Sequence, residues 1–138
     1  MIEVKHIIKQ YPEKRALDDV SATFNAHETT VILGPSGSGK STLLRTLNLL
    51  ERPTSGTLAL NDLTINFEAP IAKKEIFNVR QTFGMVFQEK ALFAHLTVLK
   101  NIIEGPVQVK KESVAVATKK AEALLERFGM TELAARYP

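Results

Sequence analysis

The sequence predicts an α/β protein that starts with an antiparallel sheet and ends in helices. Three observations support this fold class. Apolar and polar residues alternate near the start, a glycine-rich loop at residues 34–41 separates an apolar run from an amphipathic helix, and residues 97–138 carry helical signals. The length of 138 residues is sufficient for one domain with a hydrophobic core.

Half-buried strands are predicted in three places by alternation with a period of two. These places are residues 2–5, residues 20–24, and a pair of segments at 58–60 and 63–67. Asn61 and Asp62 separate the last two segments, and these residue types favour a tight turn. We therefore expect a hairpin at 58–67 and a sheet with one face in water.

Two short apolar runs predict strands that are buried on both faces. Residues 29–33 read TTVIL and stop at a glycine, and residues 82–87 read TFGMVF. Continuous apolar runs of this length are typical of parallel sheets, which helices cover on both sides. We expect both runs in a central sheet.

Helices are expected after the loop and over the last third of the chain. Leucines at helical spacing predict a helix that Pro53 ends, and a short helix is expected at 73–80. Thr97 is placed to cap a helix that runs toward Gly105-Pro106. Ser113 is placed to cap a longer helix, with Gly129 just past its end and a further turn from 131. The apolar stripe of the longer helix comprises Val114, Ala117, Ala121, Leu124, Leu125 and Phe128.

Composition excludes several classes of protein. There are no cysteines, so neither a disulfide framework nor a thiolate metal site is possible. No apolar run reaches the roughly 20 residues that span a bilayer, so we expect any membrane association to depend on a partner. The net charge is +3, without a dense basic stripe, and we expect no nucleic-acid partner.

The glycine-rich loop predicts a nucleotide phosphate site. It matches the Walker A pattern G-x-x-x-x-G-K-[ST], in which glycines let backbone amides approach phosphate oxygens. Lys40 is predicted to reach the β and γ phosphates and Ser41 to ligate Mg²⁺, while the helix that follows aims its positive end at the same anion. The predicted binding residues are Gly34, Pro35, Ser36, Gly37, Ser38, Gly39, Lys40, Ser41 and Thr42.

Several segments in order along the chain resemble an ABC-transporter ATPase, and in particular the ATP-binding subunits of polar amino-acid importers. The segments are YPEKRALDDVSATF, GPSGSGKSTLLRTLNLLERPTSG, GMVFQEKALFAHLTVLKNI, EGPVQV and LLERFGMTELAARYP. The resemblance implies ATP and Mg²⁺ as cofactors, and basic amino acids, arginine especially, as the transported substrate. It also implies a β subdomain with the phosphate loop at 1–67, a core strand and Q-loop at 68–96, and the start of a helical subdomain at 97–138.

The resemblance assigns roles to two residues outside the loop. Tyr11 matches the aromatic that stacks on adenine, and Gln88 matches the glutamine that ligates Mg²⁺ or holds the attacking water. Residues 88–96 are implied to contact the integral-membrane permease subunits. His95 follows Ala94 where the family usually has proline, so we expect a less rigid loop there. His95 is not the family's switch histidine.

The second half of the family pattern is not found in these 138 residues. No LSGGQ-like signature, Walker B aspartate, adjacent glutamate or switch histidine is present, and Asp18-Asp19 is no substitute because it lies in an outer strand. We expect an incomplete ATPase domain that exposes apolar surface and is inactive in isolation. The full-length protein is expected to be a peripheral subunit on the cytoplasmic face of the bacterial inner membrane, to form a homodimer, and to act indirectly with a periplasmic binding protein. The alternative is a non-catalytic nucleotide-binding fragment without a transport role.

Overall fold

A computed structural model describes residues 1–89 and 91–138 as two compact units, Met1–Val86 and Phe87–Pro138. The subdomain boundaries expected after residues 67 and 96 stay a prediction.

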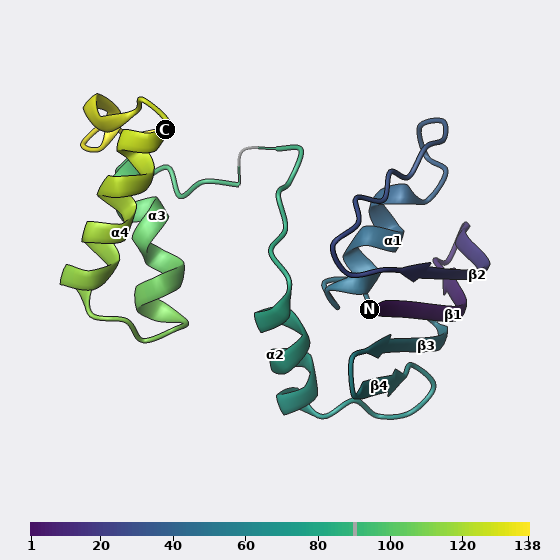
Figure 1. Ribbon diagram of the computed structural model, residues 1–138. Helices are drawn as coiled ribbons and strands as arrows, with labels where there is room; N and C mark the ends of the chain where they lie inside the picture. The colour runs from purple at the N-terminus through teal and green to yellow at the C-terminus, as the bar shows by residue number, and fades with distance from the viewer. Residues whose placement is uncertain (90) are drawn as a thin grey trace. The chain divides into compact units, whose positions relative to one another are not determined.

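A four-stranded antiparallel sheet forms the frame of the first unit. Its strands are β1 (Ile2–Gln10), β2 (Arg15–Phe24), β3 (Ser55–Leu60) and β4 (Leu63–Asn66), in the spatial order β2-β1-β3-β4 (Figure 1). The predicted hairpin is confirmed, since Leu60 pairs with Leu63 and Asn61 takes the left-handed conformation with φ of 52°. The other strands expected near the start of the chain are confirmed as well.

The core of the first unit joins one face of this sheet to two helices. These helices are α1 (Lys40–Leu47) and α2 (Lys73–Thr82), and the second confirms the short helix expected near residue 73. Val4, Ile7 and Leu58 of the sheet and Val79 of α2 are fully buried in one cluster with Leu43 and Leu47 of α1. Helix α1 is therefore fixed to the sheet by its leucines, which sets the position of the loop before it.

The two strands expected to be buried on both faces are not formed, and this prediction was wrong for the structure described. Residues 28–35 have no regular structure, α2 extends to Thr82, and residues 83–87 form no strand. Val31, Leu33 and Val86 are 70%, 85% and 97% exposed. A strand exists only where a neighbour takes up its backbone hydrogen bonds, and neither run pairs with the sheet in the described residues. The expected exposure of apolar surface is confirmed.

Helix α1 ends earlier than predicted. Asn48 rather than Pro53 terminates it, because Leu49 turns left-handed with φ of 56° and the Asn48 side-chain oxygen accepts a bond from the N–H of Leu50 at 3.0 Å. Leu50 falls in the range predicted to be helical before Pro53, but it lies outside the helix and is half exposed. A polar side chain that accepts from a neighbouring backbone N–H competes with the helix, so Asn48 ends the helix before proline is reached.

The second unit is a pair of helices, α3 (Val98–Gln108) and α4 (Val114–Arg127), followed by a short 3₁₀ turn, η1 (Thr131–Leu133). Both predicted caps are confirmed: the Thr97 hydroxyl accepts from the N–H of Lys100, and the Ser113 hydroxyl accepts from that of Val116. Gly129, with φ of 65°, closes α4 as predicted.

Two details of the second unit differ from expectation. Helix α3 continues through Pro106, although proline has no N–H to donate to the carbonyl of Ile102 one turn earlier. Only half of the predicted α4 stripe is buried, namely Ala117, Ala121 and Leu125, while Phe128 is 71% exposed. In the part of the chain that the structure describes, no helix combines the length and apolar character needed to cross a membrane.

Candidate functional site: the phosphate loop and the β1–β2 turn

The phosphate loop and the β1–β2 turn share one cavity of about 250 Å³. The turn is closed by two backbone hydrogen bonds between Tyr11 and Lys14, at 2.8 and 3.3 Å. Because β1 and β2 pair antiparallel, this turn projects from the end of the sheet toward the start of α1. The residues lining the cavity are Tyr11, Lys14, Ala16, Gly37, Ser38, Gly39, Lys40, Ser41 and Thr42.

The glycine at position 39 is required by both the conformation and the packing of the loop. Its φ is 93°, in the region that side chains disfavour, and a Cβ there would lie 2.4 Å from the carbonyl oxygen of Ala16. The loop is thus in direct backbone contact with β2. Gly37 also has a left-handed φ, 77°, but a Cβ there would meet only the Lys14 ammonium, at an ordinary contact distance of 3.7 Å. The conformations that the Walker A pattern requires are therefore present.

The start of α1 presents unpaired backbone amides to the cavity. The first backbone hydrogen bond of the helix is donated by the N–H of Leu43 to the carbonyl of Gly39 at 2.8 Å. The N–H groups of Lys40, Ser41 and Thr42 precede that bond and have no intrahelical acceptor, and Gly39 offers no side-chain cap. Together with the helix dipole they favour an anion at this position.

Two lysines add positive charge to the loop. The Lys40 ammonium donates to the carbonyls of Gly34 at 2.9 Å and Pro35 at 2.7 Å, and approaches the Ser38 hydroxyl at 3.4 Å. The Lys14 ammonium donates to the carbonyl of Gly37 at 3.0 Å. Lys14 was not singled out by sequence reasoning. The one sequence feature that could have indicated Lys14 is its position three residues after Tyr11, the aromatic residue of a short turn.

The residues present fit a nucleoside triphosphate with Mg²⁺. The cavity is lined by an aromatic residue, Tyr11, by two lysines and by the residues at the start of α1. The Ser41 side chain supplies the kind of oxygen ligand that Mg²⁺ prefers. The described residues hold no group of three or more His, Cys, Asp or Glu side chains suited to a metal. An ion here would therefore share Ser41 with phosphate oxygens and water.

Gln88 is exposed and belongs to the second unit, so its predicted role beside the loop stays a prediction. Within the segment 88–96, Lys90 lies outside the described residues. The segment is held in place by an amide that sequence reasoning missed: Asn101 of α3 bonds the N–H of Phe93 at 2.8 Å and the carbonyls of Phe93 and Leu96. The ring of His95 packs edge-on against Phe93.

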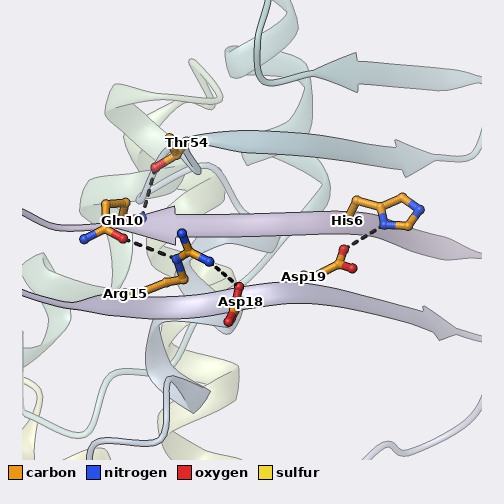
Figure 2. Close-up of polar contacts among 6 residues, drawn as sticks. All are labelled: His6, Gln10, Arg15, Asp18, Asp19 and Thr54. Carbon is orange, nitrogen blue, oxygen red and sulfur yellow. Dashed lines mark hydrogen bonds and ion pairs between the residues drawn. The ribbon is translucent and has the colours of Figure 1, made fainter.

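Asp18 and Asp19 of β2 each have a polar partner on the sheet (Figure 2). The carboxylate of Asp18 accepts from Arg15 at 2.7 Å, and that of Asp19 lies 2.7 Å from Nδ1 of His6 on the neighbouring strand. Both carboxylates are exposed, and neither lines the cavity. This agrees with the expectation that they do not replace the Mg²⁺ ligands of an ATPase.

Comparison with known proteins decides the family. A sequence profile of the family described as ABC transporter matches residues 17–138. The chain belongs to the ABC transporter family. The resemblance that the segments indicated is thereby confirmed.

The relatives of this chain within the ABC transporter family include amino-acid transport subunits. The chain is 45% identical to the arginine transport ATP-binding protein ArtM of Bacillus subtilis. The alignment covers 100% of this chain and 56% of that relative. It is 43% identical to the L-cystine transport system ATP-binding protein TcyN of Escherichia coli and 42% identical to the glutamine transport ATP-binding protein GlnQ of the same species. The chain thus spans just over half the length of these curated relatives.

Solved ABC cassettes share the fold. The dimeric structure of MJ0796, a bacterial ABC transporter cassette, superposes with a TM-score of 0.85 at 31% identity, over 100% of this chain and 62% of that one. A post-hydrolysis state of the same cassette bound to ADP and Pi gives 0.84 at 29% identity, with the same coverage. The antiparallel sheet and the helices therefore form part of an ABC ATPase domain.

Proposed function

We propose that this chain binds Mg·ATP through the loop at Gly34–Thr42 and forms part of the ATP-binding subunit of an importer for polar, and specifically basic, amino acids such as arginine. One observation carries the nucleotide part of the proposal. Tyr11 lines the same cavity as Lys40 and the other loop residues at 37–42, although Tyr11 and Lys40 are far apart in sequence.

Each group has a defined task in this proposal. The N–H groups at the start of α1 bind phosphate oxygens, and Lys40 exchanges the carbonyls of Gly34 and Pro35 for the β and γ phosphates. Ser41 ligates the Mg²⁺ ion, and Tyr11 stacks on adenine. Gln88 completes the Mg²⁺ shell or holds the attacking water. Phosphoryl transfer depends mainly on positioning and on stabilisation of charge. In this proposal these residues bind and orient the nucleotide.

The transport part of the proposal is supported by relatives. The names of ArtM and TcyN assign them to arginine and cystine transport, and the match to each spans at least 99% of this chain. Segment 88–96 would contact the integral-membrane permease, and a periplasmic binding protein would act through that permease. The full-length protein would work as a homodimer, as a peripheral subunit at the cytoplasmic face of the inner membrane.

Titration with a fluorescent ATP analogue tests nucleotide binding. Lys40→Ala is expected to weaken binding at least about ten-fold, because charge-assisted bonds to phosphate are lost. Lys119→Ala, which removes an exposed lysine of α4, is the matched control and is expected to bind as the unaltered chain does. Equal affinity of the Lys40 variant and this control would refute the proposed site.

Uptake measurements test the transported substrate. In cells that carry Lys40→Ala at the native locus, accumulation of labelled arginine is expected to fall, and accumulation of labelled cystine or glutamine is not. A loss confined to cystine or glutamine would refute the basic amino-acid proposal and leave the nucleotide site intact.

A further inference from the structure

Lys9 is an unusual lysine, because its side chain is only 14% exposed and its ammonium has three partners. It forms an ion pair with the Glu51 carboxylate and donates to the carbonyl of Arg52 at 2.8 Å. It also lies 4.8 Å from the centroid of the Tyr11 ring, within the range of a cation–π contact. A lysine is rarely buried to this extent unless such partners compensate for lost water.

The position of Lys9 follows from the strand and from the helix beside it. Lys9 lies near the end of β1, and Tyr11 follows that strand directly at the start of the β1–β2 turn. Glu51 comes just after α1, and its N–H donates to the carbonyl of Arg45 in the last turn of that helix at 3.0 Å. The contact therefore ties the aromatic residue to the C-terminal end of the helix whose N-terminal end forms the phosphate loop.

The contact with Lys9 favours the ionised form of the Glu51 carboxyl. The hydrogen bond from Lys9 holds the pKa of the Glu51 carboxyl below its usual range, and the Tyr11 hydroxyl contributes a smaller lowering. Glu51 is thus ionised at neutral pH and pairs with the Lys9 ammonium.

Tyr11 lines the nucleotide cavity, and Lys9 does not. Tyr11 is also 37% exposed, so part of the residue stays accessible although Lys9 lies over its ring. We propose that Lys9, held by Glu51, is a positioning residue that fixes the Tyr11 ring for stacking on the base of a bound nucleotide. This inference rests on the proposed function, since it assumes that the base lies against Tyr11. A cation that covers one face of an aromatic ring leaves only the opposite face for stacking on the base.

The test compares a ligand with a base to one without. Lys9→Met removes the charge and keeps the length of the side chain, and its affinity is measured calorimetrically for Mg·ATP and for inorganic tripolyphosphate. We expect a loss of about three- to ten-fold for ATP and no change for tripolyphosphate. Lys9→Arg keeps the cation and should restore most of the ATP affinity. Lys5→Met is the matched control, because Lys5 also lies on β1 and pairs with a glutamate, Glu3.

A spectroscopic readout separates positioning from general stability. The chain has two tyrosines and no tryptophan, so Tyr137→Phe leaves Tyr11 as the sole emitter. In that background, saturating ATP should change the Tyr11 emission and tripolyphosphate should not, and Lys9→Met should reduce the change. Glu51→Gln removes the other partner of the ion pair with Lys9. It should reduce the ATP-induced change in the same way, and it replaces Lys9→Met if that variant does not fold.

The outcomes distinguish this inference from the function it rests on. If neither ligand binds in a Lys40-dependent way, both the proposed function and this inference are overturned. If both ligands bind through Lys40 but the Lys9 and Glu51 variants weaken them equally, or weaken neither, only the positioning role is overturned.

Discussion

Replacing Gly39 by alanine should damage the phosphate loop and the sheet beneath it together. The φ of 93° alone costs a non-glycine residue about 1–2 kcal/mol. The new Cβ would lie 2.4 Å from the Ala16 carbonyl and 3.1 Å from a methyl group of Leu17, so β2 or the loop must move. Overpacking of this kind costs about 1–3 kcal/mol, which gives roughly 2–5 kcal/mol in total.

Denaturant unfolding and ATP titration measure the two consequences. Gly84→Ala is the matched control in the same unit, because a Cβ there meets nothing within 4 Å and its φ is not left-handed. We expect Gly39→Ala to lower the free energy of unfolding by the stated amount and to lose ATP binding, while Gly84→Ala changes neither by more than about 0.5 kcal/mol. The argument is refuted if the two variants have the same stability and the same affinity.

Three further predictions concern the core, a helix cap and pH. Leu58→Ala should cost about 2–5 kcal/mol, because Leu58 is fully buried in the core, and thermal unfolding measures it. Ser113→Ala should cost about 1 kcal/mol, seen as reduced helical circular dichroism on heating; no change would contradict the cap. The pKa of Glu51 is lowered on folding, so its stabilisation is present above the usual carboxyl range and is lost as pH falls through the folded pKa. The stability difference between the unaltered chain and Glu51→Gln should shrink in acid; a constant difference would contradict the assignment.

Features set by neighbouring residues could be predicted from the sequence. The turn at Asn61-Asp62, the caps at Thr97 and Ser113 and the conformation of Gly39 each depend on a few consecutive residues, and all four are present. The phosphate loop belongs to this class, since its pattern specifies backbone conformation and the start of a helix together.

Features that depend on distant residues were predicted incorrectly or missed. The runs at 29–33 and 82–87 have the composition of buried strands, but strand formation needs neighbours that composition does not provide. The contact of Lys14 with Gly37 spans 23 residues, and that of Lys9 with Glu51 spans 42. No periodicity connects such pairs, so only the folded sheet and helix reveal them. Tyr11 was found through resemblance, because its spacing alone does not distinguish it from an ordinary strand residue.

Backbone NMR on a chain labelled with ¹⁵N only at glycine tests the central claim most directly. Of the seven glycines, Gly34, Gly37 and Gly39 lie in the loop, and the other four serve as internal controls at positions 56, 84, 105 and 129. Adding Mg·ATP should shift the three loop signals and leave the four controls in place, and Lys40→Ala should abolish the shifts. Loop signals that stay fixed while ATP binds, or shifts confined to the controls, would contradict the account.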